Sequence, residues 1–288
     1  MNLRQALARA TENLSGIADL RGTAARDAEL LLLDTLRLTR AQFLANSTRE
    51  LTSAELSLYL EAIARRAHHE PIQYITGHQE FYGLRLRVTP SVLIPRPETE
   101  HLVEAVLERL PHDKPTSIAD VGAGSGAIAI ALAAHLPQAT ITALDISTEA
   151  LKIARENAKT HKVSDRIRFV ESDLLSALAQ PEHLEAHFDA VVSNPPYVST
   201  ADRPSLHPEV REHEPHAALF AGEEGLDVCR RLIPQASTAL HPGGLLAMEI
   251  GQGQREAVAS LLSAWNEVTF VNDLQQIPRV AIARRASA

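Results

Sequence analysis

Apolar side chains recur at helical spacing through the first quarter of the chain. From Leu3 to about Ala67 they return every three or four residues, as expected for helices that each bury one face. Thr39 and Thr52 each stand three residues before a glutamine or a glutamate, which is the pattern of a capping box at the start of a helix. The pattern predicts a small helical bundle, with a structural role for both threonines.

The helical period ends at Glu70-Pro71. Phe81 to Val88 then alternates as a strand does, and Val92–Ile94 provides a second short apolar run, so we expect a hairpin that connects two domains. Proline and acidic residues from Pro97 onward precede a helical run that reaches Leu110. A helix is therefore expected to begin near Pro97.

Beyond Pro111 short apolar runs alternate with helical stretches, which is typical of a parallel sheet with crossover helices. The last two runs have no helix between them and are expected to pair as a hairpin-like couple at one edge. The expected strands are 117–121, 140–144, 167–170, 189–193, 245–250, 268–271 and 279–283.

Length and composition fit a folded chain of two domains. The chain has 288 residues, of which 45% are hydrophobic and 22% charged, enough for one α/β domain and a smaller partner. We expect a helical domain over residues 1–75, a β-hairpin linker over 76–96 and the larger domain over 97–288.

Charge and segment patterns limit the possible partners. The net charge is −8, and residues 1–75 hold as many acidic residues as arginines, so neither half has the basic character of a nucleic-acid binder. No signal peptide and no run of 18 uncharged apolar residues is evident, so we expect a cytoplasmic protein without a membrane partner. The lone Cys229 fits a reducing compartment and is expected to be a small buried side chain.

A glycine-rich loop follows the first strand of the larger domain. Gly122, Gly124 and Gly126 expose bare backbone to a nucleotide, and Asp145 ends the next strand, where it can accept hydrogen bonds from both ribose hydroxyls. The same spacing satisfies the dinucleotide fingerprint, so a nicotinamide oxidoreductase stays open, as does a turn without a ligand. Asp120 favours S-adenosylmethionine, because its carboxylate can receive the ammonium of a methionine, which a dinucleotide lacks.

A second candidate motif, Asn194-Pro195-Pro196-Tyr197, follows the strand 189–193 at the same edge of the sheet. The prolines stiffen the loop and leave its carbonyls free to accept hydrogen bonds. The side-chain oxygen of Asn194 and the carbonyl of Pro195 can therefore accept both N–H bonds of a planar amide-type or ring nitrogen, while Tyr197 stacks on it. Out of context the motif is a common turn signal.

A planar nitrogen has a delocalised lone pair and attacks a sulfonium methyl group poorly, so it needs positioning in line with that group. Positioning contributes up to roughly 7–11 kcal/mol, and no strong general base is needed for the methyl transfer itself. A catalytic histidine or cysteine is therefore not expected.

These motifs resemble those of the bacterial peptide chain release factor N5-glutamine methyltransferases, which are class I S-adenosylmethionine-dependent enzymes. The resemblance extends over nearly the whole chain. Besides the two motifs, it rests on Pro71 to Gly77, Glu80 to Gly83, Leu93 to Glu100 and Pro208 to Arg211.

The resemblance implies a Rossmann-like α/β fold with a seven-stranded, mostly parallel sheet, preceded by an all-α domain that helps to dock the substrate. It implies methyl transfer from S-adenosylmethionine to the glutamine of the Gly-Gly-Gln motif of class 1 peptide chain release factors, with S-adenosylhomocysteine as product. The implied catalytic residues are Asn194, Pro195, Pro196 and Tyr197. The implied cofactor residues are Asp120, Gly122, Ala123, Gly124, Ser125, Gly126, Asp145, Ile146, Asp173, Leu174 and Asn194.

Two positions depart from the family pattern. Leu174 stands where some members have an aromatic residue, which removes a stacking contact, and 276–278 replaces a glycine-containing turn before the last strand. His183 and His187 have the spacing of metal ligands, but no third ligand is evident, so no metal is expected.

Two further loop segments follow strands of the larger domain, and three other functions remain open. Residues 251–254 are interpreted as a turn between a strand and a helix, and 198–225 as a lid over the target site or a solvated loop. A nucleic-acid adenine-N6 or guanine-N2 methyltransferase is the main alternative, because those families share the Asn-Pro-Pro-Tyr pattern, but the acidic balance disfavours it. The nicotinamide oxidoreductase and a catalytically silent binding module are further alternatives.

Overall fold

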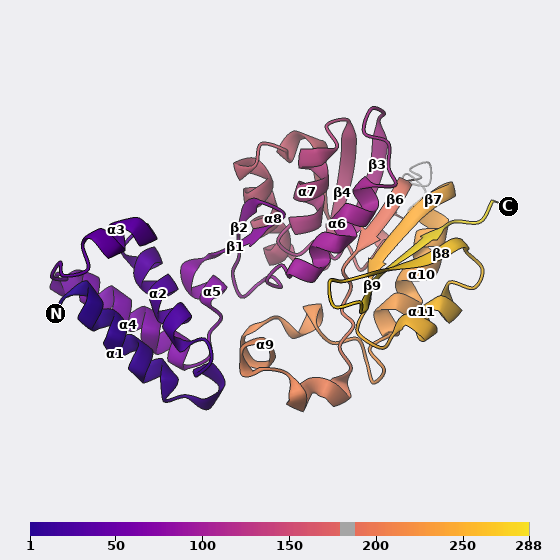
Figure 1. Cartoon of the computed structure of the whole chain (residues 1–288). Coiled ribbons are helices and arrows are strands. Elements are labelled where there is room, and N and C mark those ends of the chain that lie inside the picture. Colours follow the sequence, from indigo (N-terminus) through magenta and orange to yellow (C-terminus); the bar gives the residue numbers. More distant parts are fainter. Residues whose placement is uncertain (179–187, 288) are drawn as a thin grey trace. The chain divides into compact units, whose positions relative to one another are not determined.

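The computed structural model describes residues 1–178 and 188–287, which form two compact units (Figure 1). The first unit combines Met1–His78 with the distant segment Leu206–His213, and the second contains Gln79–Ser205 and the chain from Glu214 onward. Each unit has a hydrophobic core of its own. The domain boundaries expected from the sequence remain a prediction.

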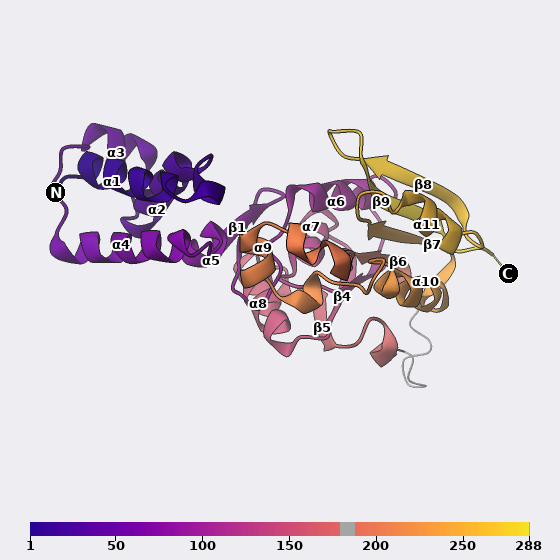
Figure 2. The same cartoon turned by 90° about the horizontal axis from the view of Figure 1, so that it is seen from below.

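The first unit is the expected helical bundle. Its main helices α1, α2 and α4 lie side by side (Figure 2) and enclose a core that contains Leu14, Leu31 and Tyr59. Both expected capping boxes are present, at Thr39 and at Thr52. The helices of this unit are α1 (Leu3–Ser15), α2 (Ala24–Thr35), α3 (Arg40–Ala45), α4 (Ser53–Ala67), α5 (Ile72–Thr76) and α9 (Pro208–His213).

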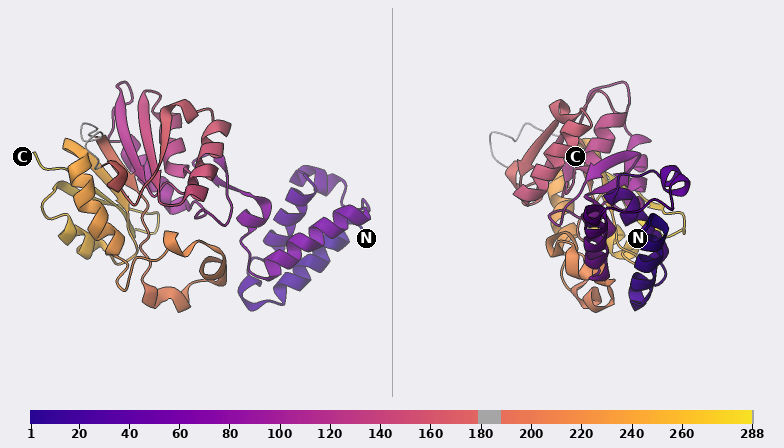
Figure 3. Two further views of the ribbon diagram at one scale, coloured as in Figure 1. Left: turned by 180° about the vertical axis from the view of Figure 1, so that it is seen from behind. Right: turned by 90° about the vertical axis from the view of Figure 1, so that its left-hand side faces the viewer.

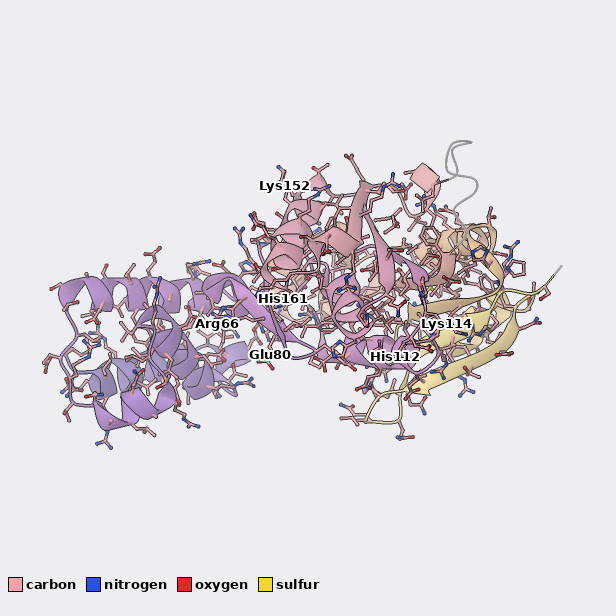
Figure 4. All side chains as sticks on the ribbon, turned by 90° about the horizontal axis from the view of Figure 1, so that it is seen from above. Arg66, Glu80, His112, Lys114, Lys152 and His161 are labelled. Atoms are coloured by element: carbon pink, nitrogen blue, oxygen red, sulfur yellow. The ribbon has the colours of Figure 1, made fainter. Side chains whose placement is uncertain are left out.

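A buried arginine ties the distant segment to this bundle. Arg66 of α4, labelled in Figure 4, donates to Asp27 Oδ2 of α2 at 2.8 Å, and both side chains are about 95% buried. The same guanidinium donates to Glu209 on α9 and to the carbonyl of Glu70 at 3.0 Å. Charged groups that are buried need such partners, so this polar contact joins α9 to α2 and α4.

The expected hairpin is present, but its strands differ from the prediction. They are β1 (His78–Phe81) and β2 (Leu84–Arg87), joined at Tyr82 and Gly83, whose φ angles are 50° and 72°. Two successive positive φ angles form the tight turn that suits a two-residue hairpin loop. The run 81–88 is thus divided by a turn, and Val92–Ile94 is not a strand.

The second unit is built on a seven-stranded sheet, which Figure 3 shows from behind. Its strands are arranged in the order β5-β4-β3-β6-β7-β9-β8. Strand β9 runs antiparallel to β7 and β8, whereas the other neighbouring strands are parallel. The expected edge couple is therefore confirmed. The strands are β3 (Thr116–Val121), β4 (Ala139–Asp145), β5 (Ile167–Glu171), β6 (Phe188–Ser193), β7 (Leu240–Glu249), β8 (Asn266–Asn272) and β9 (Pro278–Arg284).

Helices cover both faces of this sheet. Ile118 of β3 packs in the core cluster that includes α6, α7 and α8, whereas its neighbour Ala119 packs in the cluster that includes α10 and α11, as the alternation of side chains along a strand requires. These helices are α6 (Glu100–Leu107), α7 (Ala127–His135), α8 (Thr148–Thr160), α10 (Asp227–Ala239) and α11 (Arg255–Leu261). A 3-10 turn, η2 (Pro97–Thr99), precedes α6, so the helix expected near Pro97 is present.

The connection 198–225 contains short helical turns, η6 (Thr200–Ser205) and η7 (His216–Ala218), besides α9. Its role as a lid remains a prediction. Within the described parts of the chain, no helix has the length and apolar character needed to cross a membrane.

Candidate active site

The two sequence motifs lie beside each other because they end neighbouring strands. Val121 of β3 is paired in register with Ser193 of β6, and the Ser193 hydroxyl donates to the Val121 carbonyl at 2.7 Å. The next residues along the two strands are Gly122 and Asn194. A Cβ built on Gly122 would lie 3.9 Å from the carbonyl oxygen of Asn194.

The glycine loop is held in a conformation that favours glycine. Gly122 and Gly126 have φ angles of 76° and 82°, in the left-handed region where other residues are strained. A Cβ at Gly126 would also lie 3.1 Å from side-chain atoms of Ala154 and Ile130. The loop therefore passes close to α7 and α8 with little room for a side chain at its last glycine.

Asp120, just before the loop, is a fully buried carboxyl group. Its Oδ2 accepts a hydrogen bond from the backbone N–H of Ala129 at 3.0 Å, but its Oδ1 has no hydrogen-bond partner among the residues that the structure describes. Burial raises the pKa of Asp120 to about 7, and the nearby Asp145 contributes to the rise. A cation at Oδ1 would satisfy both the unused acceptor and the charge, so this position fits the ammonium group of a methionine.

Asp145 lies at the carboxyl end of β4 and contacts the same loop. Its Oδ2 accepts from Gly124 N and its Oδ1 from Ser147 N, both at 2.8 Å. Burial raises the pKa of this carboxyl group, while the backbone hydrogen bonds oppose the rise. Each carboxylate oxygen has a second lone pair, so both remain able to accept from a sugar hydroxyl. The adjacent Ile146 is 63% exposed, an unusual state for a large apolar side chain.

Residues 172–174 lie beside Asp145 at the end of β5. The backbone N–H of Ser172 donates to the Asp145 carbonyl at 2.9 Å. Asp173 pairs with Arg231 at 2.5 Å in an ion pair that is about half exposed. Leu174 has a φ angle of 54° and packs partly against the second core cluster of the sheet. The expected cofactor residues on three neighbouring strands therefore lie at one edge of the sheet.

Asn194 and Tyr197 are both anchored by side chains from elsewhere in the unit. The carboxamide Nδ2 of Asn194 donates to Thr99 Oγ1 at 3.0 Å. The Tyr197 hydroxyl donates to Glu249 Oε1 at 3.1 Å, and its backbone carbonyl accepts from Gln254 Nε2 at 3.0 Å. Burial and the Glu249 carboxylate raise the pKa of the Tyr197 hydroxyl, so it stays protonated as a donor.

Three of these anchors escaped the sequence analysis as site residues. Thr99 and Glu249 are buried polar side chains, and Gln254 belongs to the segment interpreted only as a turn. That segment does lie between β7 and α11. Gln254 also accepts from Gly251 N at 2.9 Å and donates to the Tyr197 carbonyl. A glutamate that ends a run of buried apolar residues was the signal available for Glu249.

Other candidate groups lie outside this arrangement. His183 and His187 fall outside the described residues, and in the described segments no three His, Cys, Asp or Glu side chains are grouped in a way that would hold a metal ion. Cys229 is fully buried on α10, and burial raises the pKa of its thiol to about 11. It therefore behaves as a small apolar side chain, as expected.

Comparisons with known proteins agree on one family. Residues 5–77 match the family described as PrmC N-terminal domain, and residues 99–209 match the family described as Methyltransferase small domain. The chain is 46% identical to the release factor glutamine methyltransferase of Koribacter versatilis, with 100% of both chains covered. It is 47% identical to the enzyme of that name from Moorella thermoacetica, with 92% of this chain and 90% of the relative covered.

A solved structure supports the fold at greater evolutionary distance. The 16S rRNA N2 G1207 methyltransferase of T. thermophilus, in complex with AdoMet and guanosine, aligns with a TM-score of 0.54 and 20% identity. The alignment covers 72% of this chain and 49% of that chain. At this identity the likeness concerns the fold alone.

Proposed function

Because this chain belongs to the family of release factor glutamine methyltransferases, we propose that it methylates the side-chain nitrogen N5 of the glutamine in the Gly-Gly-Gln motif of class 1 peptide chain release factors. When bound, S-adenosylmethionine would supply the methyl group, whose transfer to the nitrogen would give S-adenosylhomocysteine and release one nitrogen proton to solvent water.

The observation that carries this proposal is the position of Asn194 beside Gly122 at the ends of two neighbouring strands. An acceptor group next to a nucleotide loop suits a reaction in which a planar nitrogen must be held in line with a methyl donor. The Asn194 side-chain oxygen and the Pro195 carbonyl accept the two N–H bonds of the target amide. Pro196 stiffens the turn, and the Tyr197 ring stacks on the planar group.

For the methyl donor, we propose a site along the carboxyl ends of β3, β4 and β5. Asp120 receives the ammonium group, which fits its unpaired Oδ1. The loop from Gly122 through Ala123, Gly124 and Ser125 to Gly126 passes along the nucleoside, and Asp145 accepts from the ribose. The side chains placed around the adenine are Ile146, Asp173 and Leu174.

The proposed partner is a protein. The helical domain over residues 1–75 docks the release factor, residues 76–96 link the domains, and residues 97–288 carry out the reaction. The alternative, a nucleic-acid adenine-N6 or guanine-N2 methyltransferase, is less consistent with the relatives' names and with a net charge of −8.

Incubation of the protein with labelled S-adenosylmethionine and a purified class 1 release factor tests the proposal. We expect label on the Gly-Gly-Gln glutamine, located by mass spectrometry. Parallel incubations with RNA and DNA test the alternative. Failure to label the glutamine, with label on a nucleic acid instead, would overturn the proposed function.

Asn194→Ala is the corresponding variant. We expect transfer to fall by about 100-fold or more, the effect of removing one preorganised hydrogen-bonding group from a catalytic site. Cofactor binding, measured by isothermal titration calorimetry, should largely survive. A variant that loses both together would contradict the role assigned to Asn194.

A further inference from the structure

A chain of polar side chains runs from Asn194 into the interior of the second unit. Asn194 Nδ2 lies 3.0 Å from Thr99 Oγ1, which lies 2.6 Å from Glu249 Oε2. Thr99 is 4% exposed and Glu249 is 1% exposed, so water does not compete for these hydrogen bonds. Thr99 belongs to η2, Glu249 ends β7 and Asn194 directly follows β6, so the three residues come from distant parts of the sequence.

The direction of each hydrogen bond follows from the number of protons available. An ionised carboxylate can only accept, so with Glu249 ionised the single hydroxyl proton of Thr99 is committed to Glu249. The oxygen of Thr99 then has only lone pairs to offer Asn194, which must face it with its NH₂ group. With the carboxamide turned over, two acceptor oxygens would meet without a proton between them.

The second oxygen of Glu249 is occupied as well. It accepts from the Tyr197 hydroxyl at 3.1 Å, so this one carboxylate anchors both ends of the four-residue turn. Burial raises the pKa of Glu249, while the hydrogen bonds from Thr99 and Tyr197 oppose the rise by favouring the ionised form. Among the charged residues nearby, Glu98 adds to the rise and Arg279 opposes it.

We propose that Glu249, acting through Thr99, is a positioning residue that fixes the Asn194 carboxamide with its oxygen toward the target, so that the site selects a planar group bearing N–H bonds. This inference rests on the proposed function. Neither Glu249 nor Thr99 touches the reacting atoms. Their effect is to set which end of the Asn194 amide the substrate meets: an acceptor favours a glutamine amide and repels a glutamate carboxylate in its place.

Thr99→Val tests this proposal, because valine has the shape of threonine without the hydroxyl. The variant should lower kcat by about 10- to 100-fold, the range expected when a buried polar group loses its partner. The KM for S-adenosylmethionine should stay near that of the wild type. Thr99→Ser restores the hydroxyl and should recover most of kcat, a rescue that depends on the hydrogen bonds of the hydroxyl group rather than on the shape of the side chain.

Thr116→Val is the matched control. Thr116 is also a threonine with 4% exposure in the same unit, but it lies at the amino end of β3, where its hydroxyl donates to the Lys114 carbonyl at 3.2 Å. This substitution should leave kcat unchanged. If Thr116→Val and Thr99→Val lower kcat equally, or if Thr99→Ser fails to recover it, the positioning role of Thr99 and Glu249 is refuted.

A second measurement does not depend on methyl transfer. In the wild-type protein, one Nδ2 proton of Asn194 should exchange slowly with solvent in NMR spectra, with the resonance assigned by its loss in Asn194→Ala. Rapid exchange of both protons would refute the proposed positioning of Asn194 by Thr99 and Glu249. Absence of methyl transfer by the wild type, with slow exchange retained, would instead refute the proposed function and leave the positioning of Asn194 supported.

Discussion

Asp120 combines complete burial with an unused acceptor atom, and its pKa of about 7 makes it partly protonated at neutral pH. An ammonium ion brought next to Oδ1 would favour the ionised form and lower this pKa. Binding of S-adenosylmethionine near pH 7 should therefore release protons. The release is visible by isothermal titration calorimetry as a binding enthalpy that depends on the ionisation enthalpy of the buffer.

Asp120→Asn supplies the control for that experiment, since an asparagine has no proton to release. Its binding enthalpy should be independent of the buffer, and its affinity for S-adenosylmethionine should be lower. A wild-type enthalpy that does not vary with the buffer would contradict the assignment of Asp120 to the ammonium group.

The raised pKa of Asp120 also affects how the stability of the ligand-free protein depends on pH. The pKa of Asp120 is higher in the folded chain than in the unfolded chain, so its contribution to stability is full below about pH 4 and is lost as pH rises through about 7. Asp120→Asn should therefore raise the melting temperature relative to the wild type at pH 8, and the difference should shrink toward pH 4. Thermal unfolding followed by circular dichroism measures it, and a difference that grows toward pH 4 would have the wrong sign.

Candidate site residues could be proposed from the sequence where a short local motif contained them. Gly122, Asp145 and Asn194 stand at strand ends with recognisable neighbours, and the structure brings them to one edge of the sheet. Thr99 and Glu249 are 150 residues apart and form a hydrogen bond only because η2 lies beside the end of β7. Single-sequence patterns contain no information on such a contact, so these residues were seen only once the fold was known.

At the scale of elements, hydrophobic periodicity predicted the helical bundle and all the strands of the large sheet. The failures occurred where one backbone conformation decided the structure. Periodicity alone predicted one strand over residues 81–88. Tyr82 and Gly83 both adopt positive φ angles, so the chain turns there and forms a hairpin.

The capping boxes permit a test at this scale. Thr52 Oγ1 accepts from Glu55 N, and Glu55 in turn accepts from Thr52 N at 2.9 Å. Thr52→Ala should lower the free energy of unfolding by about 1 kcal/mol, because a backbone N–H at the start of α4 loses its partner. Denaturation in urea measures the change. Thr48→Ala, in an exposed turn before the helix, serves as the control and should have little effect.

At the scale of the whole molecule, two separate cores imply that the units can open separately. Arg66→Ala leaves the buried Asp27 carboxylate with only the Thr23 hydroxyl, at 2.9 Å. The expected cost is about 3–5 kcal/mol, typical of breaking a buried ion pair by removing one partner. Hydrogen–deuterium exchange should accelerate in α2, α4 and α9 but not in β3 or β6.

Lys152 gives the matching control, and Figure 4 shows it on the second unit. It pairs with Glu149 at 2.5 Å, but both side chains are about 60% exposed. Lys152→Ala should leave exchange unchanged in both units, because exposed ion pairs contribute little. Faster exchange throughout the sheet of the Arg66→Ala protein would mean that the two units unfold together.

Leu206–His213 belongs to the first unit although it lies more than 120 residues after His78 in the sequence. The polypeptide passes from one unit to the other three times, after His78, after Ser205 and after His213. A protease that cuts only after His78 would release residues 1–78 from the covalent chain, whereas Leu206–His213, which belongs to the same unit, would remain part of the other fragment. The helical unit is thus made of two separate stretches of the chain, and no single cut in the backbone yields two complete units.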